Sequence, residues 1–129
     1  MDRKKFLGII TGDVVTSGED TTVSQIAHMM KESNIGVVVI LRGDVIVGMI
    51  NERDIIRKVL AADRLPDEVL VKEVMCKDIV TVEIKDGLNN IYKTLCETKF
   101  RHLLVLDKGK LVGITSRRDL LDVLLSKRV

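Results

Sequence analysis

The apolar and polar positions of this chain fall into two matching series of short blocks. Each series opens with an extended segment rich in β-branched residues, at 14–16 and at 79–81, and such residues favour a strand. Apolar residues then recur at the three- and four-residue spacing of one helix face. These helix-face residues are Ile26, Met29 and Met30 in the first series, and Leu88, Ile91 and Leu95 in the second. Each series is therefore predicted to begin with a strand followed by a helix.

Two apolar runs follow each predicted helix. They are 36–41 and 45–50 in the first series, and 102–106 and 110–115 in the second. Near-continuous runs of valine, isoleucine and leucine predict strands buried on both faces, and a glycine near each join permits a tight turn. A further helix is predicted to close each series, at 53–62 and at 117–126. The predicted order is β-α-β-β-α, twice.

The second series repeats the first at a fixed offset of 65 residues. Residues 13–64 align with 78–129 without a gap. The copy-one residues that meet an identical residue in copy two are Asp13, Val15, Thr16, Ile26, Glu32, Leu41, Val47, Gly48, Arg53, Asp54 and Leu60. Pro66, the only proline, marks a linker. The fold class predicted from this repeat is α+β, with copy one in 1–65 (its linker from 62) and copy two in 66–129.

Composition narrows the possible functions. The chain has 129 residues, of which 46% are hydrophobic and 31% charged, so it is expected to fold. Its aromatic residues are Phe6, Tyr92 and Phe100, and this scarcity argues against stacking of single-stranded nucleic acid. The net charge of +2 is interleaved, and the basic ends, 3–5 and 127–128, are interpreted as solvated termini. Nucleic-acid binding is therefore the least favoured function.

The cysteines and the apolar runs indicate a compartment. Cys76 and Cys96 form no CxxC pair and lie near no cluster of histidines, so we interpret them as free thiols in a reducing cytosol and expect no metal site. The apolar stretch 6–10 is too short for a signal peptide. No run approaches 18 apolar residues, so no membrane insertion is expected. We expect a cytoplasmic protein.

The closing helices carry more apolar surface than one core face needs. In copy two these residues are Leu120, Leu121, Val123, Leu124 and Leu125. An apolar surplus in a small chain is typical of a partner surface, which favours a homodimer. Fraying of apolar residues at a terminus is the alternative.

One motif occurs at the same place in both copies, where a strand ends and the closing helix begins. It reads Gly48-Met49-Ile50-Asn51-Glu52-Arg53-Asp54 in copy one and Gly113-Ile114-Thr115-Ser116-Arg117-Arg118-Asp119 in copy two. Asn51 and Ser116 are natural N-caps, and Asp54 and Asp119 then occupy the third helical position.

Two interpretations of this motif stay open. In the first, each motif is only a helix cap, with an acid placed favourably against the helix dipole. In the second, the free amides of the junction attract a phosphate and the carboxylate one turn later accepts both hydroxyls of a ribose. The glycine before each cap is not explained by capping alone.

A tandem of β-α-β-β-α units ending in Gly-x-x-(Ser/Thr)-x-x-Asp resembles a pair of CBS domains, the unit named after cystathionine β-synthase. The resemblance covers essentially the whole chain. It implies two repeats packed sheet to sheet about a pseudo-two-fold axis, with two clefts between them. Stand-alone pairs of this kind, called Bateman modules, often bind AMP, ADP, ATP or a related adenosyl ligand as a regulatory ligand. They report its presence to a target protein and commonly form dimers through their helices.

The resemblance also implies the residues of each cleft. One cleft would place Ser116 toward phosphate, Asp119 toward ribose and Ile114 beside the base, with Thr115 between them. Its opposite wall would be Val14, Val15, Ile35 and Gly36. The other cleft would use Asn51 and Asp54, with Ile79, Val80, Phe100, Arg101 and His102 opposite.

Copy one departs from the family pattern, because Asn51 replaces the serine or threonine. Charge-assisted hydrogen bonds from Arg101 are the proposed compensation. Arg101 as a solvated strand-edge residue and His102 as a satisfied half-buried histidine are the alternatives.

No nucleophile stands beside a base in this sequence. His28 falls on the polar side of a predicted helix, and neither histidine has a carboxylate or cysteine partner by spacing. We therefore expect no enzyme, but a ligand-sensing module that binds an adenine nucleotide and signals to an unidentified target protein. A ligand-free dimerisation module is the alternative.

Overall fold

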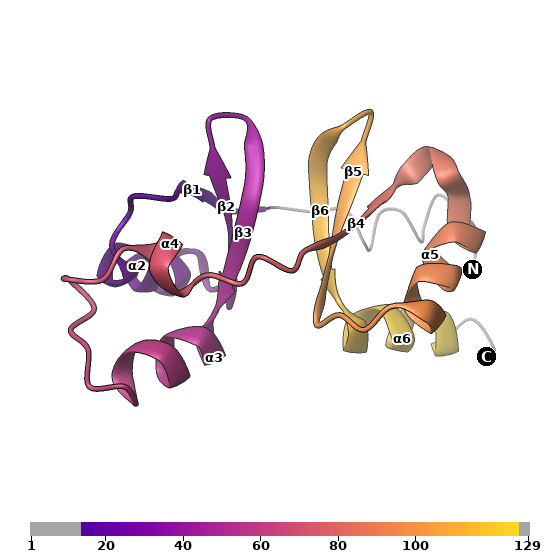
Figure 1. The fold of residues 1–129 in the computed structure, drawn as a ribbon. Helices are drawn as coiled ribbons and strands as arrows, with labels where there is room; N and C mark the ends of the chain where they lie inside the picture. The colour runs from indigo at the N-terminus through magenta and orange to yellow at the C-terminus, as the bar shows by residue number, and fades with distance from the viewer. Residues whose placement is uncertain (1–13, 127–129) are drawn as a thin grey trace. The chain divides into compact units, whose positions relative to one another are not determined.

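The computed structural model describes residues 14–126, apart from the side chains of residues 123, 124 and 126. The described residues divide into two compact units (Figure 1). The copy-one unit consists of residues 15–78, and the copy-two unit consists of residues 79–126 together with residue 14. The packing of the two repeats against each other stays a prediction.

The predicted order of elements is confirmed in both units. The copy-one unit contains β1 (Thr16–Gly18), α2 (Val23–Ser33), β2 (Val37–Arg42), β3 (Val45–Asn51), α3 (Glu52–Ile55), the π-helical η1 (Ile56–Leu60) and α4 (Val71–Val74). The copy-two unit contains β4 (Val80–Glu83), the 3-10 turn η2 (Ile84–Asp86), α5 (Gly87–Glu97), β5 (His102–Asp107), β6 (Lys110–Ser116) and α6 (Arg117–Ser126). Each three-stranded sheet pairs its first two strands in parallel and its last two antiparallel.

The two sheets also share an irregularity in register. In copy one Ile40 pairs with Gly48 and Leu41 pairs with Ile46, which leaves Val47 unpaired in β3. The same shift in copy two leaves Val112 unpaired, directly before Gly113. A bulge of this kind adds one residue to a strand and increases its twist. The sequence repeat therefore holds down to the pattern of backbone hydrogen bonds.

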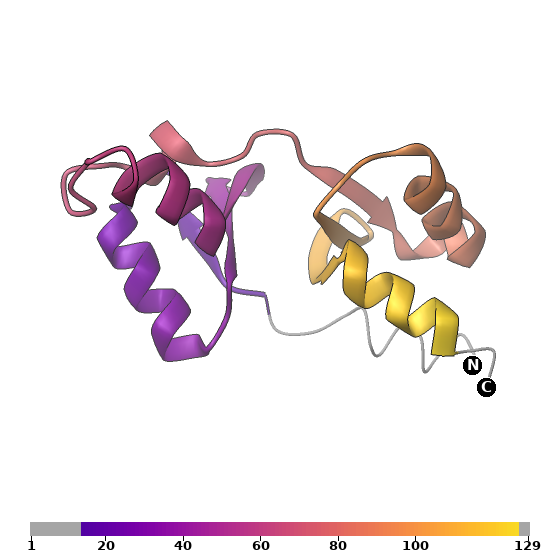
Figure 2. The same cartoon turned by 90° about the horizontal axis from the view of Figure 1, so that it is seen from below.

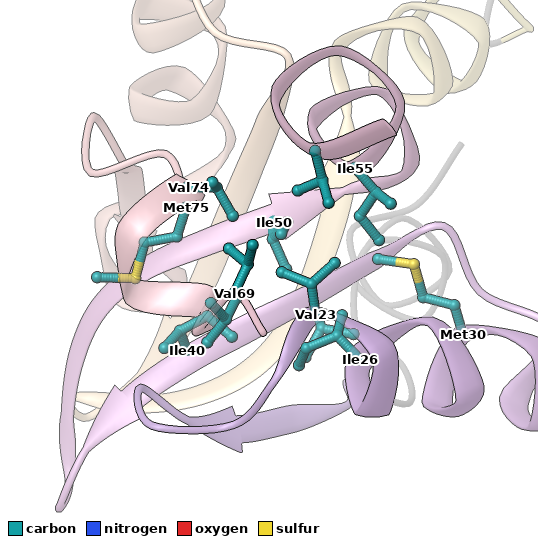
Figure 3. Close-up of a cluster of buried hydrophobic side chains, with 12 residues drawn as sticks. Val23, Ile26, Met30, Ile40, Ile50, Ile55, Val69, Val74 and Met75 are labelled. Atoms are coloured by element: carbon teal, nitrogen blue, oxygen red, sulfur yellow. The ribbon is translucent and has the colours of Figure 1, made fainter. Parts of the chain in front are cut away.

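The core of the copy-one unit fills the space between its sheet and its helices (Figures 2 and 3). Val23, Ile26 and Met30 of α2 pack there against Ile40 and Ile50 of the sheet, and all five are buried. The predicted burial is confirmed for the runs at 36–41 and 102–106, where residues 38–40 and 103–105 are buried in succession, whereas the run at 45–50 begins with Val45, which is 63% exposed. In the copy-two unit the described core residues are Val82, Ile91, Leu95, Leu103, Val105 and Leu120.

Helix α2 begins with the reciprocal capping that its sequence predicts. The Gln25 amide donates to Thr22 Oγ1 at 3.2 Å, and the Thr22 amide donates to Gln25 Oε1 at 3.0 Å. The helix ends at Asn34, whose φ of 52° is left-handed and whose N–H reaches back to the carbonyls of Lys31 and Met30. His28 is exposed, as predicted.

The segment after copy one packs on the copy-one unit. Val23 N–H donates to the Val69 carbonyl at 2.8 Å, and Ser24 N–H donates to the Pro66 carbonyl at 3.0 Å. Val71 and Val74 of α4 are buried in the same core. Division of the copies at 65 and 66 stays a prediction about the repeat, while the chain up to Asp78 belongs to this compact unit.

The closing helix of copy one differs from the prediction. A single α-helix was expected over 53–62, but α3 is followed by the π-helical η1, with five-residue hydrogen bonds from Ala61 to Ile56 and from Arg64 to Val59. Apolar spacing over one turn does not separate these two windings, because they differ by one residue per hydrogen bond. The α-helix expected over 117–126 is confirmed as α6.

Candidate functional site

In copy one both side chains of the motif are used to cap the closing helix. Asn51 Oδ1 accepts a hydrogen bond from the Asp54 amide at 2.9 Å, and Asp54 Oδ2 accepts one from the Asn51 amide at 3.0 Å. The other carboxylate oxygen, Oδ1, lies 3.4 Å from Lys58 Nζ. The Asp54 side chain is only 15% exposed. The predicted capping is therefore confirmed here, and the carboxylate has a partner on each oxygen.

In copy two the side chains at the same positions make fewer described hydrogen bonds and ion pairs. Ser116 Oγ accepts a hydrogen bond from the Asp119 amide at 2.9 Å, so Ser116 is the predicted N-cap of α6. Asp119 is exposed, and no group in the described part of the chain forms a hydrogen bond or ion pair with its carboxylate. The residue that corresponds to Lys58 is Val123. The copy-two motif thus presents an open carboxylate beside a helix N-terminus.

The glycine of the copy-one motif has a packing reason. A Cβ atom on Gly48 would lie 2.8 Å from the Cys76 carbonyl oxygen and 2.7 Å from Met75 Sδ. Two backbone hydrogen bonds between Met49 and Cys76, of 2.9 and 2.7 Å, hold the chain this close. Only glycine permits such an approach. The glycine therefore does not count as evidence for a ligand in copy one.

The copy-one residues predicted to form a wall have different surroundings. Val15 carries the carbonyl that accepts from Val39 N–H at 3.0 Å, where β1 begins to pair. Ile35 packs on the core. Gly36 is covered by Glu52: a Cβ there would lie 2.5 Å from Glu52 Oε1, and the Gly36 carbonyl accepts from the Glu52 amide at 3.0 Å.

The copy-two unit has a groove of about 810 Å³ beside its motif. The resemblance assigns Ser116 and Arg101 to different clefts, and that assignment stays a prediction. Within this unit both residues line the one groove. Its lining is Lys99, Phe100, Arg101, Ser116, Arg117, Arg118, Leu121, Asp122 and Leu125.

The other predicted copy-two residues are less accessible. His102 is half-buried and interacts with a neighbouring group, while Thr115 is only 7% exposed. Ile79, Val80 and Ile114 are half-buried. Val14, the remaining wall residue, is also half-buried.

Arg117 is a residue that sequence reasoning missed. Its guanidinium donates to the carbonyl oxygens of Leu95 at 2.7 Å and Thr98 at 3.1 Å, and it lies 5.0 Å from the centre of the Phe100 ring. The Leu95 carbonyl lies in the last turn of α5 and the Thr98 carbonyl directly follows the helix, so Arg117 supplies donors that the helix itself lacks. One sequence signal could have found Arg117: its aligned residue in copy one is Glu52, so the charge at this position is reversed between the copies.

The closing helices expose the same two apolar positions in both copies. Ile56 and Leu60 are 57% and 52% exposed, and their counterparts Leu121 and Leu125 are 40% and 52% exposed. Leu120 is buried, so part of the predicted apolar surplus belongs to the core. The side chains of Val123 and Leu124 lie outside the described residues.

Several further features of the described residues bear on function. Over 14–126 no group of three metal-ligating side chains occurs, and Cys76 and Cys96 are unpaired thiols. None of the helices described is long and apolar enough to cross a bilayer. The basic ends, 3–5 and 127–128, lie outside the described residues.

Comparison with known proteins matches both copies to one family. The family model described as the CBS domain matches residues 4–61 and 71–126. The chain is 38% identical over 113 residues to an uncharacterized protein of Methanopyrus kandleri, covering 86% of this chain and 58% of that protein. It is 29% identical over 111 residues to a CBS domain-containing protein of Bacillus subtilis, covering 86% of this chain and 79% of that one.

A solved structure of a CBS-domain containing protein from Agrobacterium tumefaciens is also similar, with a TM-score of 0.75 and 27% identity over 94% of this chain and 97% of that chain. The doubled β-α-β-β-α unit, its repeated cap motif and the two family matches lead to one conclusion. The chain is a tandem repeat protein of the CBS domain family.

Proposed function

We propose that this chain is a regulatory module whose copy-two motif binds an adenine nucleotide and whose occupancy is signalled to a partner protein. The supporting observation is the contrast between the two aspartates. Asp119 is exposed with no described partner, while Asp54 is held on both oxygens. A carboxylate with free oxygens can accept the two hydroxyls of a ribose, and it lies one turn from the amides at the start of α6.

The same unit offers complementary groups for the rest of a nucleotide. Ser116 caps α6, where backbone amides and the helix dipole favour a phosphate. Arg118 is exposed and lines the adjacent groove, so it adds positive charge near that phosphate, while Arg101 remains the proposed phosphate ligand of the other cleft. Ile114 is the proposed contact for the base. Copy-one residues Val14, Val15, Ile35 and Gly36 remain the proposed opposite wall.

Calorimetry against AMP, ADP and ATP tests this function. Wild-type chain is expected to bind at least one nucleotide, and Asp119→Ala is expected to lose the binding at the copy-two motif. Asp107→Ala is the matched control, because Asp107 is an exposed aspartate of the same unit outside the motif. No binding by the wild-type chain, or unchanged binding by Asp119→Ala, would overturn the proposal.

A ligand-free dimerisation module is the second candidate. It is favoured by two observations: Asn51 and Ser116 already cap helices, and both closing helices expose an apolar pair. This candidate predicts a dimer by light scattering that Leu121→Ser combined with Leu125→Ser turns into a monomer. It also predicts that nucleotides leave the melting temperature unchanged, whereas binding at 100 times the dissociation constant adds about 2.7 kcal/mol.

A further inference from the structure

Lys58 connects the copy-one motif to the segment that follows copy one. Its Nζ donates a hydrogen bond to the Val74 carbonyl at 3.0 Å and lies 3.4 Å from Asp54 Oδ1. Val74 ends α4, so its carbonyl has no helical donor of its own. One ammonium group therefore serves the motif carboxylate and the end of α4 together.

The same segment also contacts the other end of the motif. Met75 and Cys76 follow Val74 directly, and they press on Gly48 while Cys76 pairs with Met49 through two backbone hydrogen bonds. Segment 71–76 thus touches the motif at its first residue through backbone and at its last through Lys58. Any movement of Asp54 away from Lys58 removes one of these two attachments.

Copy two lacks this arrangement. Val123 stands where copy one has Lys58, and the Asp119 carboxylate forms no ion pair with the described residues. The difference between a held and an open aspartate therefore follows from a residue on the closing helix, outside the motif itself.

We propose that Lys58 is a latch that keeps the copy-one motif closed and couples it to segment 71–76. The ligand part rests on the proposed nucleotide-binding function. A ribose that takes Asp54 must draw the carboxylate from Asn51 and Lys58, so copy one is the weaker site. Its occupancy loosens segment 71–76, which joins the two copies. When a site must open before a ligand can bind, the apparent affinity equals the affinity of the open state multiplied by the fraction of molecules that are open.

The ligand-free half of this proposal is tested by amide hydrogen exchange. Lys58→Met keeps the apolar stem and removes the ammonium. The matched control is Arg57→Met, at the exposed residue that directly precedes Lys58. Exchange at the Cys76 and Met49 amides is expected to become about fivefold faster in Lys58→Met, since one half-exposed ion pair and one hydrogen bond are lost. It is expected to stay unchanged in Arg57→Met. Equal exchange in both variants would overturn the latch.

The ligand half is tested in an Asp119→Ala background, where copy one is the remaining site. Adding Lys58→Met is expected to tighten nucleotide binding about fivefold, and adding Arg57→Met is expected to leave it unchanged. If Cys76 exchanges faster but affinity does not change, the coupling is wrong. If no nucleotide binds the wild-type chain, the proposed function fails, while hydrogen exchange still decides whether the latch exists.

Discussion

The two copies of the motif carry the same aspartate in different states. Asp54 accepts from the Asn51 amide, pairs with Lys58 and is 15% exposed. Asp119 is exposed, and among the described residues its one side-chain partner is Ser116, whose Oγ accepts from the Asp119 amide. Both aspartates stand at the third helical position and align in the repeat. The motif therefore fixes the position of the carboxylate, while residues outside the motif, such as Lys58, decide whether its oxygens are available to a ligand.

A second contrast lies one residue after the cap. Glu52 covers Gly36 in copy one, and its carboxylate has no described hydrogen bond or ion pair, while the Arg117 side chain in copy two bonds two carbonyls near the end of α5. The reason lies in how the preceding helices end. Asn34 closes α2 with backbone bonds in a left-handed conformation, but α5 ends at Thr98 in an extended one. Copy two therefore needs a side-chain donor that copy one does not.

The largest expected effect comes from the close backbone approach at Gly48. Gly48→Ala places a Cβ 2.8 Å from the Cys76 carbonyl, and backbone at that distance cannot move as a flexible side chain can. We expect the free energy of unfolding to fall by about 3 kcal/mol, the upper end of the range for overpacking. Urea denaturation measures it. Gly18→Ala is the control, because its Cβ would meet no atom within 4 Å, and a loss equal to that of Gly48→Ala would contradict the packing explanation.

Arg117→Met tests the charge reversal between the copies. It keeps an apolar side chain beside Phe100 but removes the donors to Leu95 and Thr98, so we expect a loss of about 2 kcal/mol, typical of hydrogen bonds to a charged group. Glu52→Gln is the copy-one counterpart and is expected to change stability by less than about 0.5 kcal/mol. Thermal unfolding by calorimetry compares them. Equal losses would show that Arg117 does not stabilise the end of α5.

Alanine at the two motif aspartates tests their different states directly. Asp54→Ala removes a reciprocal cap and the Lys58 partner, and we expect a loss of about 1 kcal/mol, the usual value for a lost cap. Asp119→Ala leaves the Ser116 cap intact and removes only an acid near the helix N-terminus, worth about 0.3 kcal/mol when exposed. Urea midpoints of both variants decide. A larger loss for Asp119→Ala would reverse the assignment of held and open sites.

The smallest expected effect is a pH dependence of the stability of the copy-one unit, which comes from Glu73 and Glu19. The hydrogen bond from the Leu70 amide, together with Arg64, lowers the pKa of Glu73 below its ordinary value, and Arg42 does the same for the pKa of Glu19. A lowered folded-state pKa means that the stabilisation is present above the ordinary value of about 4.3 and is lost as the pH falls through the folded value. Melting temperature is therefore expected to drop below about pH 4.3, by less in Glu73→Gln. An identical acid-side slope in that variant would remove Glu73 from the explanation.

Local sequence signals predicted the elements well. Thr22 with Gln25, and Asn51 with Asp54, form the reciprocal caps that their spacing indicates, because such contacts lie within one turn. The strands β2 and β5 follow the apolar runs to within about one residue for the same reason. The pairing of Asp54 with Lys58 was also a local signal, because the two residues lie four positions apart on one helix. The contact of Lys58 with the Val74 carbonyl was not predictable, since these residues are 16 positions apart in the sequence.

Tertiary contacts account for the other differences. Pro66 was interpreted as marking a linker, but loop composition carries no information on whether a loop packs. Val69, Val71 and Val74 of that stretch are buried in the copy-one core. The role of Arg117 likewise depends on where α5 ends in space. What sequence did indicate at that position was a charge that differs between otherwise matching copies.

The matched bulges at Val47 and Val112 place the two motifs at equivalent positions in their sheets, so one motif can be grafted in place of the other. Each bulge shifts the register by one residue immediately before the glycine, so residues after it point to the same sides of both sheets. Residues 113–119 grafted over 48–54 would enter β3 in register and bring their own glycine to meet Cys76. A chimera with two copy-two motifs would thus separate what the motif contributes from what its neighbourhood contributes.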